Sequence, residues 1–328
     1  MLIIGIPGQG KSWALLRFMT EIYKQGVPFV TVDFHGQFSR HDEHFVKANQ
    51  PEIWHAHQGL PFSPFEASYD RGAGVNYWKS NAYEVAEIIA YVCSLGDIQK
   101  DVVFQAIKQS YEAIGFADGE GDHVETWPSI EDVFVHLRKL EDQGVARNVV
   151  ARCRGLFEFG LFNDDPEREV SLESLLKRPT VLNVSSAALE TVQLAAGALF
   201  LRKIYKDMFR WGEADRLRLF LVLDEAHRLS KDPTLPKIMR EGRKFGIIVA
   251  LASQQVGDFH PDIVNNRGSV IAFRTNYPES RRISQFFKGI GTQQEVIKLV
   301  EGLGVGRALI QLAEHENAEL AALYPYQR

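Results

Sequence analysis

The feature that most constrains this chain is a glycine-rich segment close to its amino terminus. Residues 5–12 read GIPGQGKS and fit the pattern G-x-x-x-x-G-K-[ST]. The apolar residues 2–4 predict a strand before it, and apolar positions at helical spacing predict a helix over residues 12–24. A strand, turn and helix in this order present backbone N–H groups at a helix N-terminus, which stabilises an anion. The segment therefore predicts a phosphate-binding loop; the alternative is a glycine turn that happens to precede Lys11 and Ser12.

Short apolar runs along the chain predict further strands, at residues 28–33, 180–184, 218–224, 245–252 and 269–274. Helical periodicity lies between several of them, for instance over residues 191–209. Buried runs that alternate with helices are typical of a parallel sheet covered on both faces. We therefore expect an α/β fold with a mostly parallel sheet and helices on both of its faces.

The middle of the chain has a different pattern. Helical spacing recurs over residues 83–91, 102–114 and 130–140, and a stretch rich in Gly, Asp and Glu at 115–126 predicts a mobile loop. Residues 35–68 are expected to be rich in loops. We predict that residues 1–75 and 175–328 form the core and that residues 76–174 form a mainly helical insertion or subdomain.

Composition limits the class of protein. The chain has 328 residues, 45% hydrophobic and 24% charged, which is usual for a globular protein. No apolar stretch approaches about 18 residues, so we expect no membrane insertion. The start lacks the basic region of a signal peptide, and Cys93 and Cys153 match no metal-binding spacing, so we expect reduced thiols and a cytoplasmic protein. A net charge of −5 argues against a basic protein that coats nucleic acid, although a ring can line its channel with a few Lys and Arg.

A second motif follows the apolar run at residues 219–223, which ends in Asp224 and Glu225. An Asp at the carboxyl end of a buried strand can hold Mg²⁺ together with the Ser12 hydroxyl, and the adjacent Glu can activate a water molecule as general base. Lys11 would place its charge on the outer phosphates. The alternative for the Asp-Glu pair is a solvated pair of surface charges. A phosphate-binding loop combined with Asp-Glu is typical of an ATPase that drives mechanical work.

Two further polar residues have open interpretations. Gln254 follows a predicted strand, where its amide could contact the terminal phosphate and report hydrolysis, or it could be an ordinary loop residue. Arg243 lies in the basic stretch 239–246, which is either a solvated helix end or an arginine finger that reaches the nucleotide of a neighbouring subunit.

These residues together carry a resemblance that spans nearly the whole chain. The stretches that carry it are 5–12, 32–38 (VDFHGQF), 60–65, 181–185, 223–229 (LDEAHRL), 241–254, 271–274 and 302–310. In this order they resemble the HerA/FtsK superfamily of P-loop ATPases, above all its HerA-like branch, with conjugation coupling and secretion ATPases as relatives.

The resemblance implies a RecA-like (ASCE) P-loop NTPase core, a homohexameric ring and ATP-driven translocation along, or unwinding of, double-stranded DNA. It implies ATP and Mg²⁺ as ligands, with the nucleotide bound by Gly5, Pro7, Gly8, Gln9, Gly10, Lys11, Ser12 and Trp13. Mg²⁺ would be held by Ser12 and Asp224, and Glu225 would be the water-activating base. Gln254 resembles the sensor, Arg243 a finger acting in trans, and Arg274 an arginine that relatives carry on the same strand.

The chain departs from the family pattern in two ways. Full-length relatives carry a small β-barrel before the first strand, for which this sequence leaves no room, so we expect either a fragment of a longer protein or a shortened member of the family. Gln37 stands where the family usually has Glu, and Phe34 follows Asp33. Both residues are expected at the edge of the sheet where the nucleotide would bind.

Three functions remain open at this point. The chain is a DNA motor in repair, transfer or defence, a secretion or conjugation-type transport ATPase, or a nucleotide-dependent scaffold for a partner nuclease or effector. Candidate DNA contacts are Gln99, Lys100 and Lys231, although the sequence favours plain surface for each of them.

Overall fold

A computed structural model describes residues 1–39, 44–67, 69–70, 75–117, 126–162 and 170–323. The chain divides into two compact units. Unit 1 comprises Met1–Ile53, Leu172–Asn183 and Asp207–Arg328. Unit 2 comprises Trp54–Ser171 and Val184–Lys206. The helical insertion expected over residues 76–174 stays a prediction; unit 2 also takes in residues 54–75 and 184–206.

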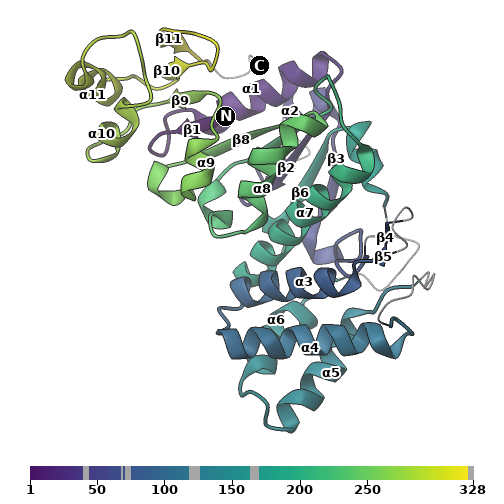
Figure 1. The fold of residues 1–328 in the computed structure, drawn as a ribbon. Helices are drawn as coiled ribbons and strands as arrows, with labels where there is room; N and C mark the ends of the chain where they lie inside the picture. The colour runs from purple at the N-terminus through teal and green to yellow at the C-terminus, as the bar shows by residue number, and fades with distance from the viewer. Residues whose placement is uncertain (40–43, 68, 71–74, 118–125, 163–169, 324–328) are drawn as a thin grey trace. The chain divides into compact units, whose positions relative to one another are not determined.

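Unit 1 is built on a mostly parallel sheet (Figure 1). In the described residues the sheet has nine strands in the order β11-β10-β9-β1-β8-β7-β2-β6-β3. Their bounds are β1 Leu2–Ile4, β2 Phe29–Asp33, β3 Glu52–His55, β6 Thr180–Asn183, β7 Leu219–Leu223, β8 Ile247–Ser253, β9 Val270–Ala272, β10 Arg307–Gln311 and β11 Glu319–Ala322. The pairs β9–β1, β1–β8, β8–β7, β7–β2 and β2–β6 are parallel, whereas β10 runs antiparallel to both β9 and β11.

Burial along the strands shows that both faces of this sheet are covered. Every residue of β1, β2 and β7 is buried, although neighbouring side chains on a strand point to opposite faces. On one face, Ile3, Phe29 and Phe220 share a core cluster with Leu15 and Met19 of α1 (Lys11–Lys24). The expected α/β fold with a parallel sheet is therefore confirmed.

Further helices of unit 1 follow the strands. They are α2 His44–Asn49, α8 Thr234–Glu241, α9 Pro261–Asn265, α10 Glu279–Ser284 and α11 Gln293–Glu301. In Figure 1, α10, α11 and the β10–β11 hairpin gather at the end of the sheet marked by β9. Ala308 of β10 belongs to the same core cluster as α1, and the partly buried Ile310 packs against that cluster.

Unit 2 is mainly helical. Its helices are α3 Trp78–Val92, α4 Asp97–Ala113, α5 Ile130–Asp142, α6 Val149–Glu158 and the larger part of α7, Glu190–Trp211, beside a short hairpin of β4 Tyr69–Asp70 and β5 Val75–Asn76. Successive helices from α3 to α6 pack against one another. Cys93 and Cys153 are buried free thiols, and a hydrogen bond from Cys93, followed by burial, raises the pKa of Cys153.

The sequence pattern missed some elements. Residues 35–68, expected to be rich in loops, contain α2 and β3, and the β10–β11 hairpin was not predicted. Most of the loop expected over residues 115–126 lies outside the described residues. Within the described part of the chain, no helix is both long and apolar enough to cross a membrane.

Candidate active site

The glycine-rich loop links β1 to α1 and turns tightly at two glycines. Gly8 and Gly10 have φ angles of 78° and 109°, a region that L-residues with side chains rarely adopt. Gly10 is the N-cap of α1, so Lys11 is the first residue of the helix. The Lys11 Nζ donates hydrogen bonds to the carbonyl oxygens of Gly5 at 2.7 Å and Ile6 at 3.2 Å. Burial lowers the pKa of Lys11, and the nearby carboxylates of Asp224 and Glu225 oppose that shift.

Three neighbouring segments hold this loop in place. The backbone N–H of Gly5 donates to Ser253 at the end of β8, and that of Ile6 donates to Arg274 just after β9. On the far side, the N–H of Gly306 donates to the Gln9 carbonyl at 3.0 Å. A Cβ on Gly5 would lie 2.7 Å from the Cβ of Phe273, so a side chain at Gly5 would push the loop off β9.

Asp224 follows β7 and is the centre of the polar contacts. Its Oδ2 accepts hydrogen bonds from the Ser12 hydroxyl and from the Gln37 amide, each at 2.6 Å. Its Oδ1 accepts from the backbone N–H of Glu225 at 3.0 Å. A hydroxyl and a carboxylate in contact are hard oxygen donors of the kind that Mg²⁺ prefers when phosphate supplies further ligands. The donor set therefore fits the expected magnesium ion.

A cavity of about 260 Å³ lies beside the Ser12 hydroxyl. It is lined by Gly8, Gly10, Lys11, Ser12, Trp13 and Gln37. The ring of Trp13 is 47% exposed, so its side chain remains accessible beside the cavity. The loop, the Lys11 cation and the Ser12 hydroxyl thus surround one space that suits a polyphosphate, and Asp224 lies directly behind it through its hydrogen bonds with Ser12 and Gln37.

Glu225 has an unusual backbone conformation. Its φ is 55°, in the left-handed region that costs a non-glycine residue about 1 kcal/mol or more. The Glu225 Oε2 lies 3.2 Å from Nδ1 of His227, which makes an ion pair when the imidazole is protonated. The chain thus holds the carboxylate directly after Asp224 in a conformation that packing must enforce.

Asp33 organises the segment that carries Gln37. This fully buried carboxylate, at the end of β2, accepts hydrogen bonds from the backbone N–H groups of His35, Gln37 and Phe38 and from the Ser39 hydroxyl. Burial raises the pKa of Asp33, and these hydrogen bonds act against the shift. Sequence reasoning did not assign Asp33 a role. An Asp that ends a buried strand shortly before a His-Gly turn is the signal that could have found it.

The other predicted site residues lie at two different edges of the sheet. Gln254 follows β8 and Arg274 follows β9, so both lie at the carboxyl edge beside the glycine-rich loop. Arg243 lies in a 3₁₀ turn before β8 begins, at the opposite edge. β8 has seven residues, so the two edges are about 20 Å apart. An arginine side chain cannot span that distance within one chain.

Two of the three surface residues considered as DNA contacts, Gln99 and Lys100, have local partners. The Gln99 side chain accepts from Gly96 N–H and donates to the Arg147 carbonyl at 2.9 Å. Lys100 lies 3.7 Å from Asp97 and over the ring of Tyr83. Lys231 is exposed. A role for any of the three in DNA contact stays a prediction.

Two models of known protein families match parts of this sequence. The family model described as "Helicase HerA, central domain" matches residues 1–204. The chain belongs to this HerA family. A second model, "Type IV secretion-system coupling protein DNA-binding domain", matches residues 181–264. A protein of Methanocaldococcus jannaschii named "Probable DNA double-strand break repair helicase HerA" is 32% identical over 100 residues. That match spans 28% of this chain and only a fifth, 20%, of the relative's length.

Solved structures support the same fold. VirB4 of Thermoanaerobacter pseudethanolicus superimposes with a TM-score of 0.72 at 17% identity, over 97% of this chain and 87% of the other. The plasmid coupling protein TrwB, in a structure with a non-hydrolysable ATP analogue, gives a TM-score of 0.68 at 15% identity, over 99% and 85%. The chain therefore belongs to the HerA family of P-loop NTPases and shares the RecA-like fold of VirB4 and TrwB.

Proposed function

We propose that this protein hydrolyses ATP and uses the energy to move along, or unwind, double-stranded DNA as a homohexameric ring. The observation that carries the ATPase part is that Lys11 and Ser12 line one cavity, that the Ser12 hydroxyl bonds to Asp224, and that Glu225 follows Asp224 directly. The DNA part is supported by the family of the chain and by its match to a coupling-protein DNA-binding model. TrwB has been crystallised with ADP and Mg²⁺, which supports both as ligands of this site.

In this proposal the loop residues Gly5 to Trp13 bind the triphosphate of ATP. Backbone N–H groups of the loop and the Lys11 ammonium stabilise the phosphate oxygens. Ser12 and Asp224 hold Mg²⁺, which supplies positive charge to the outer phosphates. Glu225 accepts a proton from the attacking water. At the same step the oxygen of that water bonds to the terminal phosphorus, and the bond between this phosphorus and ADP breaks. Gln254, directly after β8, contacts the terminal phosphate and senses its loss.

Arg243 acts in trans in this proposal. Its place at the opposite edge of the sheet, about 20 Å from the glycine-rich loop, supports a contact with the nucleotide of a neighbouring copy rather than its own. The guanidinium would stabilise charge on the transferred phosphoryl group. Arg274 lies beside the glycine-rich loop of its own chain and acts in cis, on the nucleotide bound by that chain.

The experiment that tests the function is steady-state phosphate release with and without blunt duplex DNA, with Glu225→Gln protein as the control for contaminating ATPases. The proposal predicts that duplex DNA raises the rate of the wild-type protein and that the variant stays at background. A rate of phosphate release that stays the same with every DNA tested contradicts a DNA motor and supports a transport ATPase instead. Activation of a partner nuclease or effector by the Glu225→Gln variant supports the scaffold. The cytoplasmic location expected from the sequence stays a prediction.

A further inference from the structure

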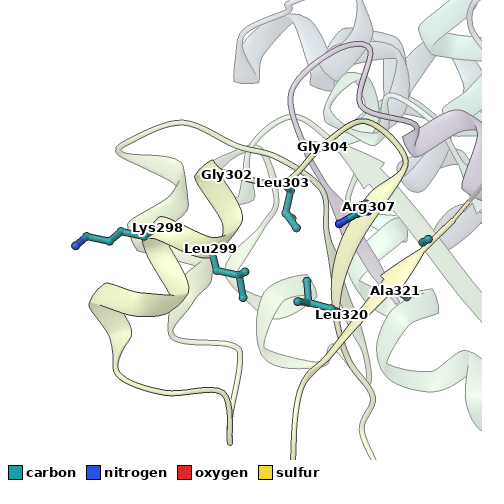
Figure 2. A pocket seen from close by; sticks show the side chains of 9 residues that line it. Lys298, Leu299, Gly302, Leu303, Gly304, Arg307, Leu320 and Ala321 are labelled. Carbon is teal, nitrogen blue, oxygen red and sulfur yellow. The ribbon is translucent and has the colours of Figure 1, made fainter.

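A second cavity of unit 1 lies between α11 and the β10–β11 hairpin and measures about 440 Å³. Figure 2 shows Leu299, Leu303 and Leu320 pointing into it from three directions. Arg307 lies at its edge, whereas the side chain of Lys298 extends away from it. The cavity is therefore an apolar space with a cationic group at its rim.

The turn at one end of this cavity also touches the glycine-rich loop. Gly304 and Arg307 line the cavity, and Gly306 between them donates its N–H to the Gln9 carbonyl at 3.0 Å. A Cβ on Gly10 would lie 3.5 Å from the Cα of Gly306. This cavity and the glycine-rich loop thus adjoin the same short turn.

Strand order gives the loop two distinct sides. β8, β7 and β2 lie on one side of β1, and β9, β10 and β11 lie on the other. Asp224 and Gln37 follow β7 and β2, so the groups that act on the terminal phosphate lie on the first side. The nucleoside, at the opposite end of the phosphate chain, then extends toward β9, β10 and β11.

We propose that the cavity between α11 and the β10–β11 hairpin receives the purine nucleoside of the triphosphate bound at the glycine-rich loop. This inference rests on the proposed function. The volume lies in the range of small-molecule sites, and three leucines offer the apolar walls that bury an aromatic base. Arg307 at the rim suits a ligand that carries negative phosphates next to the base.

The lining also predicts which nucleotides bind. Among the lining residues no side chain is a carboxylate, an amide or a hydroxyl, so none can accept a hydrogen bond from the base. The two side chains that can donate are Lys298, which extends away from the cavity, and Arg307, which lies at its rim toward the phosphates. Apolar pockets discriminate between similar ligands by about 100-fold at most, whereas sites built on hydrogen bonds reach about 10⁴-fold. We expect ATP and GTP to bind with affinities within about 100-fold of each other.

The test is equilibrium binding of Mg-ATP, Mg-GTP and Mg-tripolyphosphate to the full chain by calorimetry. Leu320→Trp fills the cavity from β11, and Leu299→Trp fills it from α11. Leu320 is 56% exposed, so the fold tolerates the larger ring, and Leu312→Trp on an exposed leucine (41%) outside the cavity is the matched control. We expect both cavity variants to weaken ATP and GTP binding by about tenfold or more and to leave tripolyphosphate binding unchanged.

Three outcomes overturn the inference. The first is unchanged ATP binding by both cavity variants. The second is wild-type protein that binds tripolyphosphate as tightly as ATP, which removes any role for the nucleoside but leaves the proposed function intact. The third is wild-type protein that binds neither ligand, which overturns the proposed function as well. Tripolyphosphate binding by a variant also shows that the variant is folded.

Discussion

The two sides of the glycine-rich loop, one toward β7 and β2 and the other toward β9 to β11, differ in the side chains that they offer to a ligand. On the β7 and β2 side, a hydroxyl, an amide and a backbone N–H all converge on the carboxylate of Asp224 at 2.6–3.0 Å. On the β9 to β11 side, leucines enclose a space and Arg307 lies at its rim. The reacting end of a nucleotide requires charges at fixed positions, because charge develops there. The nucleoside end requires only volume and exclusion of water.

The largest expected effect comes from a residue outside both sides. Arg243→Ala should lower the ATPase rate by about 10³-fold or more, because an arginine finger is worth that much, while ATP affinity stays unchanged. Steady-state phosphate release and nucleotide binding, measured on the same protein, check this. Lys244→Ala is the matched control, since Lys244 pairs with Glu213 at 2.7 Å on the surface. Equal losses in both variants would show that the turn, and not the guanidinium, matters.

Glu225→Gln separates chemistry from binding on the polar side. Loss of a general base lowers the rate by about 10²- to 10⁴-fold, and the amide keeps the size of the side chain. We expect the rate to fall by that factor with ATP affinity changed less than about threefold. Single-turnover phosphate release with saturating Mg-ATP gives the rate. A variant that hydrolyses ATP at the wild-type rate would remove Glu225 from the mechanism.

A fall in pH should stabilise the folded state through Asp232, a buried carboxylate before α8. Burial raises the pKa of Asp232 to about 6, although its Oδ1 accepts N–H bonds from Thr234 and Leu235. The folded state therefore disfavours the ionised form, and this group adds stability as the pH falls from above 6 toward 4. The gain is about 3 kcal/mol.

Thermal unfolding of wild-type and Asp232→Asn proteins between pH 7.5 and about 4.5 measures this effect. The amide does not titrate, so the stability of the wild type relative to the variant should rise as the pH falls. A difference that stays constant with pH would show that Asp232 does not titrate in this range.

Gln37 tests how the polar side tolerates charge. Gln37→Glu places a second carboxylate against Asp224, which repels it unless a cation lies between them. We expect the ratio of ATP affinity with Mg²⁺ to that with EDTA to rise by about tenfold or more. Gln37→Ala should leave the ratio within about twofold. The same ratio in both variants would mean that the amide contributes packing alone.

The difference between the polar residues around Asp224 and the apolar cavity also explains which parts of the site the sequence could predict. Lys11, Ser12, Asp224 and Glu225 were assigned because phosphate, metal and water chemistry each require particular residue types at particular places. The strands that carry them were also predicted, since their buried apolar runs are continuous. The assigned roles themselves stay predictions.

The β10–β11 hairpin and its cavity left no such signal. Leucines that line a cavity have the same pattern as leucines that fill a core, and Leu320 is exposed on an edge strand. Asp33 was also missed, although its hydrogen-bond partners lie within six residues of it. The Gln37–Asp224 contact was missed because it depends on the approach of β2 and β7, and the two contacting side chains are 187 residues apart in the sequence. Long-range pairing of this kind is set by packing rather than by local pattern.

A mixing experiment tests the central claim, that hydrolysis at this site needs Arg243 from a neighbouring copy. Arg243→Ala subunits keep Glu225 but supply no guanidinium, and Glu225→Gln subunits supply the guanidinium but lack the base. Phosphate release is measured for each variant alone and for their mixture at the same total concentration, with duplex DNA present. The account predicts that the mixture exceeds the sum of the separate rates, because mixed interfaces contain complete sites. A mixture that only matches that sum contradicts a site shared between copies.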